Sequence, residues 1–268
     1  MPHGMSWFRL LMGSLYAKIE HWAGFLSWPV NGDGKTWIAG EHVGIEHVLG
    51  ALAVATVLLL LGLITRISLR RREQSLLPEE RLSTRTFMEL LVGATYGMMR
   101  DIMGAKAARF FLPLIGTCAL FILFSNLMGL IPGFSPPTDS LNTTLACAAV
   151  VFIATQVFGL VEHGMGYLAH FLGPIRKWYA LPLMLMMLAM EVLSDVLVRP
   201  GSLSVRLMAN MTADHMVLGT FHSLNPFTAF GLPVLVYMLG TLVCVVQTLV
   251  FCLLSTTYIA MAIQHEEH

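Results

Sequence analysis

The stretch RPGSLSVRLMANMTADH, residues 199–215, places two arginines, an asparagine, an aspartate and a histidine inside a strongly apolar region. Spacings of three, four and seven residues put six polar side chains on one face of a helix: Asp195, Arg199, Ser202, Arg206, Asn210 and Asp214. A guanidinium at the centre of a membrane costs ~3 kcal/mol on insertion scales, so it normally faces water or a partner. Arg206 is therefore the first candidate for a functional residue. The alternative is an arginine near a helix end whose side chain extends to the membrane interface.

The composition around this stretch is that of a membrane protein. Of the 268 residues, 56% are hydrophobic and 12% are charged, whereas soluble domains carry about 25% charged residues. Several uncharged runs exceed the ~18 residues that indicate a spanning helix. The 16 basic and 16 acidic side chains balance, which gives no indication of nucleic-acid binding. The four cysteines lie in apolar segments without a Cys-x-x-Cys pair, so we interpret them as structural thiols.

We predict an all-α polytopic membrane protein with about five membrane helices and one amphipathic surface helix. Residues 1–44 are predicted to form a surface arm outside the cytoplasm, because its four tryptophans favour the headgroup region. This arm lacks the pattern of a removed signal peptide. Residues 45–268 form the predicted membrane domain, with spans near 48–65, 110–131, 141–161, 178–222 and 226–263. Between the first two spans, FMELLVGATYGMMRDIMG, residues 87–104, is the expected surface helix.

The last two predicted spans are longer than a bilayer requires. As single helices, residues 178–221 would measure ~66 Å and residues 226–263 ~57 Å, against a hydrocarbon layer ~30 Å thick. Such helices must tilt, break or fold back, and Pro200 and Pro233 allow bends. We expect a hairpin of two long, tilted helices that lays its charged stripe against a partner in the membrane.

The arginines predict the orientation of the chain. RISLRRRE, residues 66–73, follows the first span and should remain in the cytoplasm. With that assignment, 11 of the 16 lysines and arginines lie on the cytoplasmic side and three lie outside. We therefore predict an outside N-terminus and a cytoplasmic C-terminus.

Three segments carry more specific information: FSNLMGLIPGF with the following PTDSLNTTLA, RPGSLSVRLMANMTADH, and VVQTLVFCLLSTTYIAMAIQHEEH at the end of the chain. Together, and in this order, they resemble subunit a of the F-type ATP synthase, the stator of its proton-driven rotor. The similarity extends from about residue 45 to the C-terminus. It implies a non-catalytic, proton-conducting protein of the bacterial inner membrane, without a cofactor or metal. The implied partners are the rotating c-ring, the peripheral-stalk subunit b, the lipid bilayer and the translocated proton.

The resemblance assigns roles to single residues. Arg206 matches the family's essential arginine, and Asn210 matches an asparagine one turn beyond it, beside the outside-facing proton path. Gln247 matches the glutamine of the last helix that approaches this arginine. His215 occupies a site where the family has glutamate or histidine, and Asn126 matches the asparagine of the second span's motif.

Other positions fit the family less closely. Arg199 falls where the family often has a basic residue, and Glu191 and Asp195 lie near the acidic position of the inward-facing path, with a register open by one residue. Asp214 replaces a usual glycine, and Gly240 stands where relatives often carry a histidine or an acid. Whether Asp214 supplies this acid or only solvates a helix end stays open.

Two other functions remain open at this stage. Pairs of histidines seven residues apart, His163 with His170 and His215 with His222, have a spacing that would suit a haem-binding membrane oxidoreductase. For the first pair, ordinary polar packing near the interface is the simpler interpretation. A solute permease would place its site between inverted repeats, and the sequence contains no such repeat. The choice between proton and sodium is also open, with protons favoured by family frequency.

Overall fold

The computed structural model of the chain describes residues 46–70, 83–131, 134, 136–163, 181–223 and 232–263. In this part of the chain the regular elements are all helical, which confirms the predicted all-α class. Four helices are long and apolar enough to cross a membrane: α2 (Glu46–Arg70), α3 (Thr84–Gly129), α4 (Leu141–His163) and α8 (Leu232–Ile263). The chain is thus a multi-pass membrane protein. The predicted arm at residues 1–44 lies outside the described residues.

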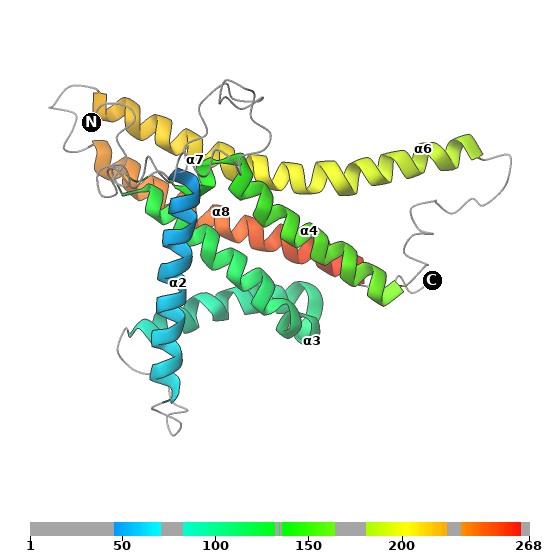
Figure 1. Ribbon diagram of the computed structural model, residues 1–268, viewed down its shortest axis with the longest axis horizontal. Helices are drawn as coiled ribbons and strands as arrows, with labels where there is room; N and C mark the ends of the chain where they lie inside the picture. Colours follow the sequence, from blue (N-terminus) through cyan, green and yellow to red (C-terminus); the bar gives the residue numbers. More distant parts are fainter. Residues whose placement is uncertain are drawn as a thin grey trace, which may run out of the picture.

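Helix α3 contains both the expected surface helix and the expected second span. Its two arms meet at Gly104, whose φ of 81° lies in a region that glycine adopts without a steric penalty (Figure 1). Helical backbone resumes directly after Gly104, ahead of the predicted start of the span at Phe110. The structure thus keeps the two predicted segments as separate helical arms on either side of a kink at Gly104, the residue at which the expected surface helix ends.

A second long element carries the polar stripe. Helix α6 (Leu181–Val192), the π-helical turn η3 (Leu193–Val198) and α7 (Arg199–Ser223) follow one another without a break and form one rod (Figure 1). Pro200 explains the π turn, because proline donates no backbone hydrogen bond and its ring displaces the carbonyl group four residues earlier. The bend expected at this proline therefore takes the form of a widened turn just before it.

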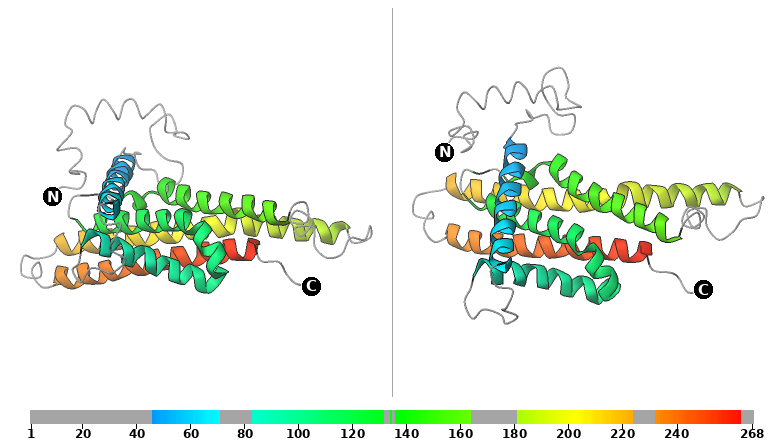
Figure 2. Two further views of the ribbon diagram at one scale, coloured as in Figure 1. Left: turned by 90° about the horizontal axis from the view of Figure 1, so that it is seen from below. Right: turned by 60° about the horizontal axis from the view of Figure 1, so that its bottom comes forward.

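Helix α8 returns antiparallel to α7, as expected for a hairpin, and the two run side by side in both views of Figure 2. Helix α3 packs against α8, and α4 packs against both α7 and α8. Helix α2 crosses the bundle at a steep angle and contacts mainly α3 (Figure 2). The hairpin therefore has one side against the bundle and another side without a neighbour in the described part of the chain.

Two buried clusters hold the hairpin in place. One joins four helices through Ile122 and Phe251 with a set of smaller side chains: Ala148, Val151, Leu203 and Leu207. The other joins α3 to α8 and includes Met99, Phe111 and Ile259. Lipid is as apolar as these side chains, so such helices associate through close packing and interhelical hydrogen bonds rather than through the hydrophobic effect. Because Leu203 and Leu207 face this core, the rotation of α7 is fixed.

Candidate functional site

Arg206 projects from α7 away from the bundle. Its side chain is exposed, while Leu203 and Leu207, on either side of it in the sequence, are only 3% and 1% exposed. Within the described part of the chain its guanidinium group has no ion-pair partner. A permanent cation therefore stands on the side of the hairpin that has no neighbour in the described part of the chain.

Two predicted residues meet across the hairpin one turn beyond Arg206. The amide Nδ2 of Asn210 donates a hydrogen bond of 2.6 Å to Oε1 of Gln247, which is 5% exposed. Beside this bond lies a narrow cleft, whose polar lining consists of Asn126, Asn210, Asp214 and Gln247. The structure thus brings four of the predicted residues together at one end of the site.

A short loop closes the same end of the bundle. The turn η1 (Pro137–Asp139) is tied to α3 by Thr138, whose hydroxyl donates a 2.8 Å hydrogen bond to Oδ1 of Asn126. It is tied to α7 by Thr212, whose hydroxyl donates a 2.5 Å hydrogen bond to Oδ1 of Asp139. The sequence analysis gave Asn126 a role by resemblance but assigned none to the other three. Their only signal was their position in or near motifs already singled out.

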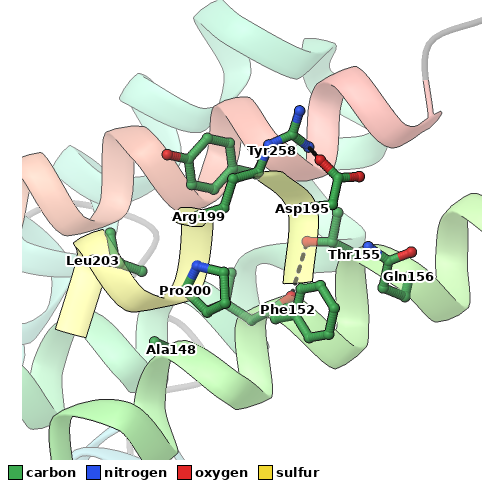
Figure 3. Close-up of a pocket in the computed structure, with 10 residues that line it drawn as sticks. Ala148, Phe152, Thr155, Gln156, Asp195, Arg199, Pro200, Leu203 and Tyr258 are labelled. Carbon is green, nitrogen blue, oxygen red and sulfur yellow. Dashed lines mark hydrogen bonds and ion pairs between the residues drawn. The ribbon is translucent and has the colours of Figure 1, made fainter. Parts of the chain in front are cut away.

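The other end of the site contains an ion pair whose carboxylate is buried and whose guanidinium group is partly exposed. Nη1 of Arg199 lies 2.8 Å from Oδ1 of Asp195, and the guanidinium carbon lies 5.5 Å from the centre of the Tyr258 ring (Figure 3). Asp195 is only 4% exposed. These three side chains, with Thr155 and Gln156 of α4, line a small, partly open pocket with room for about one water molecule. Tyr258 was not among the predicted site residues, although its aromatic ring is what the guanidinium stacks on.

Gly240, one of the two departures from the family pattern, packs closely against Leu130. The residue is buried on α8, and a Cβ atom added to it would lie 2.9 Å from Cδ2 of Leu130. A larger side chain at this position would require the end of the Leu130 side chain to move.

Several predicted side chains lie outside the described residues. For Glu191 and His215 the structure gives the backbone, in α6 and α7, but not the side chain. The same holds for His163 and His222, and His170 is not described at all. The histidine pairs and the role of His215 therefore stay predictions.

The sequence also resembles known proteins. Residues 50–260 match the family model of the ATP synthase A chain, which is more than half of the sequence. The chain belongs to the ATP synthase subunit a family. Subunit a of Sorangium cellulosum is 45% identical over 239 residues, which cover 88% of this chain and 90% of that protein. Subunit a 2 of Syntrophotalea carbinolica is 43% identical over 84% of this chain and 88% of its own length.

A third subunit a, from Geobacter sulfurreducens, is 47% identical over 173 residues, 65% of this chain and 71% of that protein. These matches confirm the resemblance seen in the three sequence segments. Membership in the subunit a family supports a role in proton transport for ATP synthesis.

Proposed function

We propose that the chain is the proton-conducting stator subunit of the ATP synthase Fo motor and that Arg206 faces the carboxylates of a rotating c-ring. The observation that carries this proposal is the exposed guanidinium of Arg206 on the free side of the α7 and α8 hairpin. It lies between two polar groups that the structure separates along α7. The chain would move protons and make or break no other bond.

The chemistry of arginine suits this role. Its side chain does not lose its proton in practice, and a fixed positive charge lowers the pKa of a carboxyl group brought within ~4–6 Å. A protonated rotor carboxyl arriving from lipid would therefore release its proton next to Arg206. The same charge prevents a proton from passing straight through the stator. Each charge that crosses by way of the rotor releases ~2.3 kcal/mol per 100 mV of membrane potential.

The two polar ends of the site fit two offset half-channels. The outer one would use the cleft beside Asn210, with Asp214 and His215 as its titratable groups. The inner one would use Glu191 and the cavity around Asp195. Arg206 lies between these groups along the rod. A proton would therefore travel from one to the other only while bound to a carboxyl group of the rotor.

The orientation and partners complete the proposal. The N-terminus would lie outside and the C-terminus in the cytoplasm of a bacterial inner membrane. Helix α2 leaves apolar side chains uncovered, with Leu52 and Leu59 63% and 69% exposed. This surface is available to lipid and to the peripheral-stalk subunit b.

Cross-linking tests the rotor-facing position of the hairpin. In a background without the four native cysteines, single cysteines replace Val205 on α7 or Leu249 on α8, both about half exposed. Matched cysteines replace the similarly exposed Leu160 on α4 and Val57 on α2. The proposal predicts cross-links to the c subunit from the first two positions only. Cross-links from α4 or α2 and none from the hairpin would contradict it.

A further inference from the structure

We infer that Asp195, Arg199 and Tyr258 form a clamp that sets the position of Arg206, and that Asp195 serves in it as a fixed counter-charge rather than as a proton carrier. This inference rests on the proposed role of Arg206 and revises the part of Asp195 in the inner half-channel. The clamp consists of the 2.8 Å ion pair and the stacking of Arg199 over Tyr258 (Figure 3).

The register of the hairpin supports the clamp. Arg199 contacts Tyr258, and Asn210 contacts Gln247, so each step of eleven residues along α7 is matched by eleven residues in the opposite direction along α8. The two side-chain contacts thus belong to one antiparallel register, and they lie roughly 16 Å apart at 1.5 Å per residue.

Both contacts are made by side chains on the face of α7 that carries Arg206. At 100° per residue, Arg199 and Asn210 each point within about 40° of the direction of Arg206. Arg206 lies seven residues after the first and four before the second. A rotation or a slide of α7 that moved Arg206 would therefore have to break both contacts.

The clamp also lies where the backbone hydrogen-bond pattern of the helix is interrupted. Asp195 belongs to the π turn, Arg199 is the first residue of α7, and Pro200 donates no backbone hydrogen bond. The ion pair spans this interruption and connects the two parts of the rod through side chains. Arginine suits both contacts, because its planar group pairs with a carboxylate and stacks on an aromatic ring at the same time.

Burial decides the role of Asp195. The Asp195 side chain is 6% exposed and that of Arg199 is 30% exposed, so removing one partner leaves the other charge uncompensated at a largely buried site, whereas replacing both partners by neutral groups is often tolerated. A proton carrier must instead lose and regain its proton and has to be titratable. The clamp therefore predicts that a neutral hydrogen-bonded pair works in place of the charged pair.

The experiment compares Asp195→Asn, Asp195→Glu and the double variant Asp195→Asn with Arg199→Gln in the assembled complex. ATP-driven acidification of inverted vesicles is measured across pH 6 to 8, which brackets the ordinary range of histidine, and is normalised to the amount of complex. Asp195→Asn alone should pump at least about fivefold more slowly. The double variant, which has no carboxyl group in the clamp, should pump within about twofold of wild type with an unchanged pH profile.

Two substitutions of Tyr258 test the contribution of its aromatic ring. Tyr258→Phe keeps the aromatic face and should pump faster than Tyr258→Leu, which removes it. If Asp195→Asn fails to assemble, recovery of assembly in the double variant supports the clamp. A double variant as slow as Asp195→Asn, beside an active Asp195→Glu, would make Asp195 a proton carrier and overturn the clamp. Arg206→Ala is measured in parallel: if it pumps normally, the proposed function fails whatever the clamp variants do.

Discussion

Asn210 donates a 2.6 Å hydrogen bond to Gln247 across the hairpin, one helical turn beyond Arg206. Gln247 is buried, so this bond satisfies an amide that would otherwise lack a partner in an apolar setting. Between membrane helices, hydrogen bonds of this kind add to packing in fixing which residues face each other. The bond therefore positions α7 relative to α8 and also presents amide groups to the cleft beside it.

Asn210→Leu should destabilise the complex because it leaves the Gln247 carbonyl oxygen buried without its donor, a loss of ~1–3 kcal/mol. The double variant Asn210→Leu with Gln247→Leu should regain much of that stability, since both polar groups are gone, yet pump slowly, since the cleft has lost its amides. Thermal unfolding of the purified complex and ATP-driven pumping measure the two effects. Equal stability of wild type and Asn210→Leu would show that the bond contributes nothing.

The hydrogen bond from Thr138 to Asn126 should be needed for stability. Both residues are buried, at 0% and 2% exposure. Thr138→Val keeps the shape but removes the donor, so we expect a loss of ~1–3 kcal/mol in the free energy of unfolding. Thr241→Val is the matched control, because Thr241 is exposed and its hydroxyl bonds only to the backbone of its own helix. A larger effect at Thr241 than at Thr138 would contradict the prediction.

Asp214→Asn should slow proton flow, because it removes a titratable group from the cleft while keeping its shape. Gly240→Glu, which recreates the acid common in relatives, should restore part of that flow only together with Leu130→Ala, since Leu130 fills the space next to Gly240. Passive proton flux through Fo is the measurement. Equal flux in wild type and Asp214→Asn would reduce Asp214 to a residue that solvates a helix end.

Cysteines introduced at Ser75 and Ser140 should label from opposite sides of the membrane. The arginines at residues 66–73 place the first loop in the cytoplasm, and Ser140 follows the turn η1, one span later. An impermeant thiol reagent applied to intact cells or inverted vesicles distinguishes the sides in a cysteine-free background. Labelling of both positions from the same side would refute the orientation.

Much of the architecture was predictable because long apolar runs have few alternatives in a membrane. The predicted span 141–161 lies within α4, and the two overlong segments contain the rod and α8. The π turn was not predicted, since proline indicates a bend without specifying which hydrogen-bond pattern absorbs it. The sharp kink between the surface helix and the second span depends on the backbone angles of Gly104, about which hydropathy carries no information.

The site was predictable on one helix and not between helices. Helical spacing places Asp195, Arg199 and Arg206 on one face, but it does not show that the first two pair with each other. The contacts of Tyr258 and Thr212 with the site could be assigned only when the register of neighbouring elements was known. In retrospect, the equal spacing of Arg199 from Asn210 and of Gln247 from Tyr258 is a signal that the sequence contained.

The central claim is that the exposed charge of Arg206 couples proton flow to the rotor. Its most direct test is ATP-driven acidification of inverted vesicles that carry Arg206→Ala, with assembled complex quantified and with Val150→Ala, an exposed residue of α4, as control. We predict an assembled complex in which Arg206→Ala pumps no protons and Val150→Ala pumps like wild type. Retention of about half of the wild-type pumping by an assembled Arg206→Ala complex would contradict the role of this residue as the fixed charge of the stator.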